Sequence, residues 1–335
     1  MAFDTAFFVE PIIKSLILVL GLTLGFAYLT LFERRVLARM QVRIGPNRAG
    51  PGGILQPIAD AVKLIFKEEL IPSAADKVVF VLAPIITVVP ALIVLGVVPF
   101  GPTVNLFGRS VRLAVADLNV GVLYILSITS IAVYGIVLAG WASNNKYAMM
   151  GGIRSSAQMV SYELSLGLAW LGPILLANSM SLESIVEAQR SMWFVVFQPV
   201  GVLVFFIAAL AEVNRAPFDM PEAEQELTAG YHVEYSGMKF ALFFMAEYIK
   251  MIAVCVIAAT LFLGGYLGPF VDRLPWLGPL YLLLKVVALL FVMVWVRATL
   301  PRFRYDRLMA FGWKILMPLA LANVLVTAVV LVVIG

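Results

Sequence analysis

The sequence predicts an all-α integral membrane protein that crosses the bilayer about eight times. Of its 335 residues, 62% are apolar or aromatic and only 13% are charged, and the mean hydropathy is +0.99. Soluble proteins are nearer half apolar and a quarter charged. This composition excludes a water-soluble domain and a disordered chain, and it indicates a single membrane domain over residues 1–335.

Eight segments are apolar and long enough, at about 20 residues, to cross the hydrocarbon core as helices. The first is not expected to be a cleaved signal peptide, because its apolar run reaches Phe32 and ends at Glu33 without a small-residue cleavage site. No internal repeat is visible, which argues against an inverted-repeat transporter. The predicted spans are residues 13–32, 78–98, 118–141, 158–178, 193–211, 238–263, 278–297 and 313–334.

Basic residues predict the orientation of these spans. An even number of spans places both termini on the same side. The loops 33–77, 142–157, 212–237 and 298–312, with their flanks, carry 17 of the 24 Lys and Arg residues. Because basic loops stay in the cytoplasm, we expect these four loops to be cytoplasmic and both termini to be non-cytoplasmic.

The first cytoplasmic loop contains a predicted amphipathic helix near residues 55–68. At about 14 residues it is too short to cross the bilayer, so we expect it to lie at the membrane interface. It is either a plain interfacial anchor or the cover of an opening through which a lipid-soluble ligand enters. Its apolar face consists of Leu55, Ile58, Val62, Ile65 and Phe66, and its charged residues off that face are Asp60, Lys63 and Lys67.

The loop 212–237 is acidic at its start. Five carboxylates and one arginine occur within 15 residues, and Pro217 and Pro221 prevent a continuous regular helix. Carboxylates this close raise one another's pKa, which favours groups that change protonation near neutral pH. The alternative is a solvated acidic loop. The carboxylates are Glu212, Asp219, Glu222, Glu224 and Glu226.

Ionisable residues also lie inside the predicted spans, where each costs roughly 3 kcal/mol unless it is paired or hydrated. Glu247 and Lys250 are three residues apart and can pair on one helix face. Glu163 has no partner nearby in the sequence, which makes it a candidate for a proton path, with a structural hydrogen bond as the alternative. Lys285 lies nearer the end of its span and is weaker evidence.

The chain carries no sequence motif for binding a redox cofactor by itself. Cys255 and His232 are its only cysteine and histidine. They cannot supply an iron–sulfur cluster, a Cys-rich zinc site or a bis-histidine haem. A glycine-rich dinucleotide fingerprint and a Walker A motif are also missing. The basic loop 297–314 is typical of topology determinants or anionic-lipid contacts, and it could also be a docking surface or a counter-charge to the acidic loop. The net charge of +4 is a topology signal and does not indicate nucleic-acid binding.

Seven stretches, most of them in the two long loops, carry motifs that occur together in one family: Glu33-Arg34-Arg35, Gln41 to Asn47, Leu55 to Ala61, Glu212 to Leu227, His232 to Tyr235, Met245 to Tyr248 and Arg297 to Asp306. With these motifs the chain resembles the NADH dehydrogenase subunit 1 family, the H subunits of proton-pumping NADH:quinone oxidoreductase, respiratory complex I. The resemblance runs from about residue 30 to the end. The two loop motifs together are specific, whereas eight spans alone are not.

The resemblance implies a subunit at the junction of the membrane and peripheral arms that forms the membrane part of the quinone chamber. It places quinone access between the first span, the amphipathic helix and the sixth span. Some members carry a glutamate where this chain has Ser130, which leaves the relay through the third span open. The implied quinone-binding residues are Glu33, Arg34, Arg35, Arg39, Asp60, Lys63, Phe66, Arg215 and Phe218, and the implied proton relay is Glu163, Glu212, Asp219, Glu222, Glu224, Glu226 and Glu247.

The resemblance also implies that quinone is the substrate and that FMN and iron–sulfur clusters belong to partner subunits, with no metal held by this chain. The expected partners are soluble quinone-site subunits, neighbouring membrane-arm subunits and the bilayer of a bacterial plasma membrane. Three alternatives are a related subunit of a membrane-bound hydrogenase or ferredoxin-linked complex, a stand-alone ion transporter and a structural anchor. The missing repeat and the large charged loops argue against the transporter, and the carboxylates inside the spans argue against the anchor.

Overall fold

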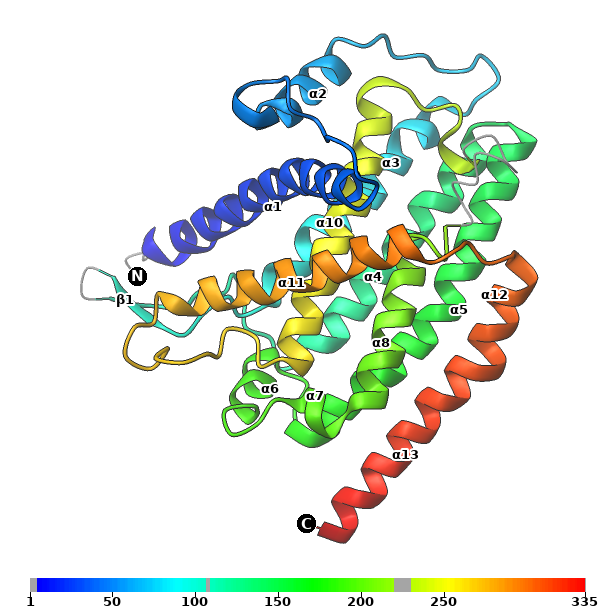
Figure 1. The fold of residues 1–335 in the computed structure, drawn as a ribbon. Helices are drawn as coiled ribbons and strands as arrows, with labels where there is room; N and C mark the ends of the chain where they lie inside the picture. Colours follow the sequence, from blue (N-terminus) through cyan, green and yellow to red (C-terminus); the bar gives the residue numbers. More distant parts are fainter. Residues whose placement is uncertain (1–4, 107–108, 220–229, 335) are drawn as a thin grey trace.

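The computed structural model describes residues 5–106, 109–219 and 230–334 and shows a bundle of long helices (Figure 1). Within these residues, seven helical segments are long and apolar enough to cross a membrane, which confirms the all-α membrane fold. They are α1 (Thr5–Met40), α3 (Lys77–Ile93) with η2 (Val94–Val97), α4 (Gly121–Ala142), α5 (Lys146–Ala177), α10 (Gly237–Phe262), α11 (Leu277–Thr299), and α12 (Tyr305–Phe311) continued by η4 (Gly312–Leu316) and α13 (Met317–Ile334).

The predicted span 193–211 is not one continuous helix. It consists of α7 (Phe194–Phe197) and α8 (Pro199–Glu212), with a break at Gln198. Pro199 has no N–H to donate, so it begins a helix but does not continue one. At 14 residues α8 is about 21 Å long, shorter than a typical span, and it packs against α5.

Two predicted boundaries also differ from the structure. The fourth span begins at Lys146, where the Asn145 side chain accepts a hydrogen bond from Tyr147 N at 2.9 Å, so most of the predicted loop 142–157 is helical. The first span continues to Met40, which places the arginines after Phe32 on a helix. Hydropathy detects only the part of a helix that lies in the hydrocarbon core of the membrane. Polar residues can continue the same helix beyond that core. The amphipathic helix is present as α2 (Gln56–Ile65), preceded by η1 (Pro51–Gly53).

The core of the bundle is centred on α10. It is the most buried of the long helices and packs against α1, α3 and α11, whereas α1 and α13 lie at the periphery. Small residues allow close packing between spans. A Cβ at Gly135 of α4 would lie 2.1 Å from Thr87 Oγ1 of α3, so only glycine fits there.

The two ends of the bundle carry different elements (Figure 1). At the α2 end, the Ser236 hydroxyl donates to Glu68 O at 3.2 Å, which ties the residues after η3 (Gly230–His232) to the segment after α2. At the α6 end, α6 (Leu182–Ala188) and α7 lie near residues 263–276 and near a hairpin of β1 (Val104–Leu106) and β2 (Arg109–Val111). The hairpin is antiparallel and pairs Val104 with Val111. The positive-inside prediction places the α2 end in the cytoplasm.

Candidate functional site

The predicted quinone residues of α1 and α2 come together at the α2 end. Arg34 Nη1 lies 2.8 Å from Asp60 Oδ2, and Lys63 Nζ lies 3.9 Å from Asp60 Oδ1. Arg35 donates a hydrogen bond to the carbonyl of Gly52 in η1. Arg39 lies exposed at the end of α1, about one turn beyond Arg35. These contacts hold α2 against the end of α1. They also bring the positively charged side chains of both helices together around Asp60.

The apolar face of α2 points away from the bundle. Ile58 is 56% exposed, Val62 is 46% exposed and Phe66, just after the helix, is 83% exposed. Exposed apolar side chains on one face of a short helix, with charges on the other, suit the membrane interface. This arrangement supports the interfacial helix that the sequence predicts.

A buried ionic cluster lies next to the arginines at the end of α1, deeper in the bundle. Glu33 of α1 is buried and forms ion pairs with Arg297 at the end of α11 and with Arg215, whose Nη1 lies 4.0 Å from Glu33 Oε1. Arg215 is also buried, and its guanidinium lies 4.3 Å from the ring centroid of Tyr248. Buried ion pairs cost desolvation free energy, so their stabilising effect depends on well-matched partners. The cluster joins α1, α10 and α11 to the start of the acidic loop.

The first residues of the acidic loop are fixed against α5. Gln158 Nε2 donates to Ala211 O and to Phe218 O, both at 2.8 Å. The Phe218 ring packs against Tyr162 and stacks on Phe303, with ring centroids 5.7 Å apart in both cases. Asp219 follows and is half-buried. The predicted relay residues Glu222, Glu224 and Glu226 lie outside the described residues.

The predicted carboxylates within the spans gather around Lys250 in the middle of the bundle. Glu163 accepts a hydrogen bond from Ser130 of α4, and Glu247 accepts one from the Tyr231 hydroxyl at 2.8 Å. Glu212, Glu247 and Glu163 all lie close enough for their charges to act on Lys250. Lys250 Nζ makes no hydrogen bond to a described residue, so it is not directly bonded to Glu247 as the spacing suggested.

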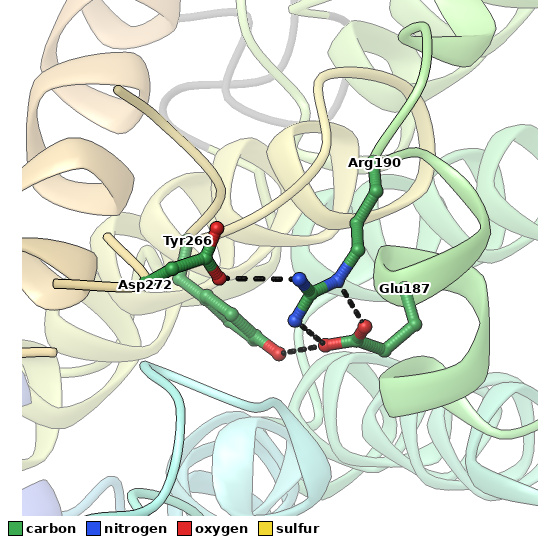
Figure 2. A network of polar contacts seen from close by, with 4 residues as sticks. All are labelled: Glu187, Arg190, Tyr266 and Asp272. Carbon is green, nitrogen blue, oxygen red and sulfur yellow. Dashed lines mark hydrogen bonds and ion pairs between the residues drawn. The ribbon is translucent and has the colours of Figure 1, made fainter. Parts of the chain in front are cut away.

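Two charged sites lie apart from this series, at the α6 end. Figure 2 shows Arg190 between Glu187 of α6 and Asp272, with the Tyr266 hydroxyl donating to Glu187 at 2.9 Å. The hydrogen bond from Arg190 is the main reason that the pKa of Glu187 lies below its ordinary value. Lys285 donates to three main-chain carbonyls between residues 263 and 267 at 2.7–2.8 Å. Each site ties a helix or its end to residues 263–272, and Lys285 therefore has a structural role.

Sequence reasoning missed several partners of the predicted residues. The sequence gives no role to Gln158 or Tyr231, and it predicts Arg297 as part of a basic loop, not as the partner of Glu33. A buried Gln within a span was the only available signal for Gln158. The other pairs link segments far apart in the chain, and residue spacing carries no information about them.

A large cavity lies along α1, on the side that faces α11. It has a volume of about 680 Å³ and is almost entirely apolar. Its walls come from α1, α10 and α11, and none of the predicted quinone residues lines it. Six of its lining residues are Gly21, Gly25, Ile252, Val256, Leu283 and Val287.

Comparisons with known proteins identify the relatives of this chain. A sequence model of the family described as NADH dehydrogenase matches residues 13–328. The chain is 53% identical over 322 residues to the H subunit of NADH-quinone oxidoreductase from Thermomicrobium roseum, covering 93% of both chains. It is 51% identical over 326 residues to the H subunit of the same enzyme from Syntrophotalea carbinolica, covering 97% of both. Among the described residues, no group of three or more His, Cys, Asp or Glu could hold a metal ion.

Proposed function

The chain belongs to the family of H subunits of NADH-quinone oxidoreductase, membrane subunits of complex I, and on this premise we propose that it couples quinone reduction to proton translocation through a relay of carboxylates. It is a multi-pass integral membrane protein of a bacterial membrane, and its partners are other subunits of complex I. The quinone chamber, the relay and the location of the redox cofactors are parts of the proposal.

The observation that carries the proposal is the buried contact between Glu33 and Arg215. Glu33 lies one residue before Arg34, which contacts Asp60 at the surface of α2. Arg215 lies three residues after Glu212, which belongs to the buried group around Lys250. This contact therefore connects the residues proposed to bind quinone with the residues proposed to move protons.

The first part of the proposal concerns quinone. The head group passes the arginines at the end of α1 and reaches a reaction site shared with a soluble subunit, which agrees with the cations gathered around Asp60. Phe218, three residues after Arg215, is buried between Tyr162 and Phe303, so it supports the start of the acidic loop from inside the bundle. FMN and the iron–sulfur clusters belong to partner subunits, because one cysteine and one histidine cannot hold a cluster. This chain therefore contributes binding and charge to the reaction, and its partners contribute the electrons.

The second part concerns the transfer of charge. Quinone reduction creates negative charge at the chamber, and this charge competes with Glu33 for Arg215. At 4 Å, two unit charges interact by about 4 kcal/mol at an effective dielectric constant of about 20. A change in this pairing is therefore large enough to alter the proton affinity of neighbouring carboxylates, first among them Glu212. A proton that Glu212 takes up then passes inward to Glu247 and Glu163.

The proposal is tested with Glu163→Gln and Glu212→Gln in the assembled complex reconstituted into vesicles. Both variants should lose most proton pumping, measured by quenching of a pH-sensitive dye during NADH oxidation. Glu183→Gln is the matched control, because Glu183 is a partly exposed carboxylate of α6 that lies outside the proposed relay. Wild-type pumping in both relay variants, with normal assembly, would exclude the carboxylate relay.

A further inference from the structure

The segment that follows α2 is fastened to the beginning of α10. The hydroxyl of Ser236, the residue before α10, accepts a hydrogen bond from Leu70 N at 3.1 Å and donates one to Glu68 O at 3.2 Å. The carboxylate of Glu69 lies between these two residues in the chain and forms an ion pair with Lys239, in the first turn of α10. Two side chains at the start of α10 therefore hold three successive residues of the segment after α2.

The two segments approach each other closely at Gly237. This residue is buried and has a φ of 58°, a conformation that residues with a side chain rarely adopt. A Cβ at this position would lie 3.0 Å from Glu69 Cγ and 3.2 Å from Lys67 O, so a larger residue would push the segments apart. The Lys239 side chain is only 14% exposed. Its charge therefore depends on the carboxylate of Glu69 more than the charge of a fully solvated lysine would.

Polar contacts to two different helices determine the position of α2. Asp60 within α2 lies 2.8 Å from Arg34 of α1, the segment after α2 is fastened to α10, and α2 packs against both helices. The side chains of Ile58 and Phe66 are more than half exposed, so burial of this apolar face against the bundle does not hold α2 in place. Loss of either polar attachment should therefore leave α2 free to shift.

We propose that Ser236 and Lys239 are positioning residues that hold α2 in the place where quinone passes it. This inference rests on the proposed function, in which the quinone head group passes the end of α1 beside α2. A fastened α2 is always in the position that accepts quinone, whereas a loose α2 is there for only part of the time. The apparent affinity for quinone then falls in proportion to that fraction. The KM for quinone should change more than kcat, because both residues lie outside the proposed relay.

Hydrogen–deuterium exchange of the assembled complex tests the attachment itself. Lys239→Met removes the lysine charge but keeps an apolar side chain, and Glu69→Gln removes the charge of its partner. Both variants should increase the exchange of amides in the segment after α2 several-fold. Lys146→Met is the matched control, because Lys146 is an exposed lysine at the first residue of α5, and the Asn145 side chain before it contacts Glu234 at 2.7 Å, close to the start of α10. Unchanged exchange in both variants of the pair overturns the attachment.

Steady-state kinetics with a long-tailed quinone test the positioning role. The KM should rise several-fold in Lys239→Met and in Glu69→Gln, with kcat close to the wild-type value and no change in Lys146→Met. Exchanging the two charges, by Glu69→Lys together with Lys239→Glu, should restore both the KM and the slow amide exchange, because the pair attracts again. Faster exchange with a wild-type KM overturns the positioning role, and so does a KM that stays raised after the charges are exchanged.

Two features of this design keep its result unambiguous. If Lys239→Met does not assemble, Glu69→Gln answers the same question from the more exposed partner, which is 40% exposed. Pumping by Glu163→Gln concerns the relay alone, whereas amide exchange and the KM for quinone concern α2. A failure of the relay and a failure of the attachment are therefore seen in different measurements.

Discussion

The hydroxyl of Ser130 on α4 donates a hydrogen bond to the carboxylate of Glu163 on α5. The same hydroxyl lies 2.9 Å from the carbonyl of Leu126, one turn earlier in its own helix. A hydroxyl has one proton and can also accept, so Ser130 has a suitable partner in both protonation states of Glu163. It donates to the ionised carboxylate, or it donates to Leu126 and accepts from the protonated acid. In the proposed relay, this serine therefore provides the partner of Glu163 where some relatives are expected to carry a glutamate.

We predict that Ser130→Ala slows proton pumping more than it affects assembly. Loss of a hydrogen bond to a charged group changes its free energy by about 1.5–3 kcal/mol, which is enough to disturb proton transfer at Glu163. The measurement is the pumping rate relative to NADH oxidation in vesicles. Ser127→Ala is the control, because Ser127 lies on the same helix and, among the described residues, its hydroxyl bonds only to Leu123 O, at 2.9 Å. Equal effects of the two substitutions would contradict a specific role of Ser130.

A second prediction concerns Asp60 on α2. Asp60→Asn should raise the KM for quinone at saturating NADH, because it releases Arg34 and changes the charge at the proposed access route. Stability should change by less than about 1 kcal/mol, since the pair is partly exposed. Asp117→Asn provides the comparison, because Asp117 makes an ion pair with Arg112 at 2.7 Å at the α6 end. If the KM for quinone rises in Asp117→Asn but not in Asp60→Asn, α2 does not form part of the access route.

The cavity between α1 and α11 permits a test of which side of α1 the quinone uses. Gly21 lines this cavity, and a Cβ there would meet no atom within 4 Å, so Gly21→Leu fills the space without a clash at its base. Because the proposed route lies on the α2 side, the KM for quinone should be unchanged in this variant. Steady-state kinetics with a long-tailed quinone provide the measurement. A several-fold increase would show that the tail occupies the α11 side.

The membrane fold could be predicted from the sequence because burial in lipid requires long apolar runs. Seven of the eight predicted segments correspond to helices of sufficient length. The exception is the segment around Gln198. One proline separates α7 from α8 within this apolar run, and hydropathy alone does not detect such a break. The start of α5 was missed for the opposite reason. Its first turns contain polar residues such as Lys146 and Arg154, which form helix outside the apolar stretch.

The sequence indicates which charged residues belong to the candidate site, but it does not predict most of their contacts. The charged residues stood out because they are rare in apolar surroundings, and their local motifs indicated a family. Their partners depend on how helices pack. Glu33 meets Arg297 from the far end of the chain, and Glu163 meets Ser130 across two helices. The local spacing of Glu247 and Lys250 suggested a pair on one helix face, whereas Tyr231 bonds to Glu247 and Lys250 Nζ makes no hydrogen bond to a described residue.

The last prediction concerns the network in Figure 2, at the α6 end. The pKa of Glu187 is lowered mainly by the hydrogen bond from Arg190, with a smaller contribution from Tyr266, while burial acts in the opposite direction. A carboxyl with a lowered pKa stabilises the fold above its ordinary value of 4.5, and this stabilisation is lost as the pH falls through the folded-state pKa. Because Glu187 is 41% exposed, its contribution at neutral pH is about 1 kcal/mol or less.

Glu187→Gln should therefore lower the thermal stability of the complex slightly at pH 7, and the difference from wild type should shrink as the pH falls below 4.5. Thermal unfolding of this subunit, followed by protease cleavage of its loops between pH 7 and pH 4, provides the measurement. Quinone turnover at pH 7 should be unchanged, because the network lies at the opposite end of the bundle from Asp60. A stability difference that grows on acidification would mean that the network is held together by a group other than Glu187. A loss of quinone turnover at constant stability would instead place the α6 end in the coupling mechanism.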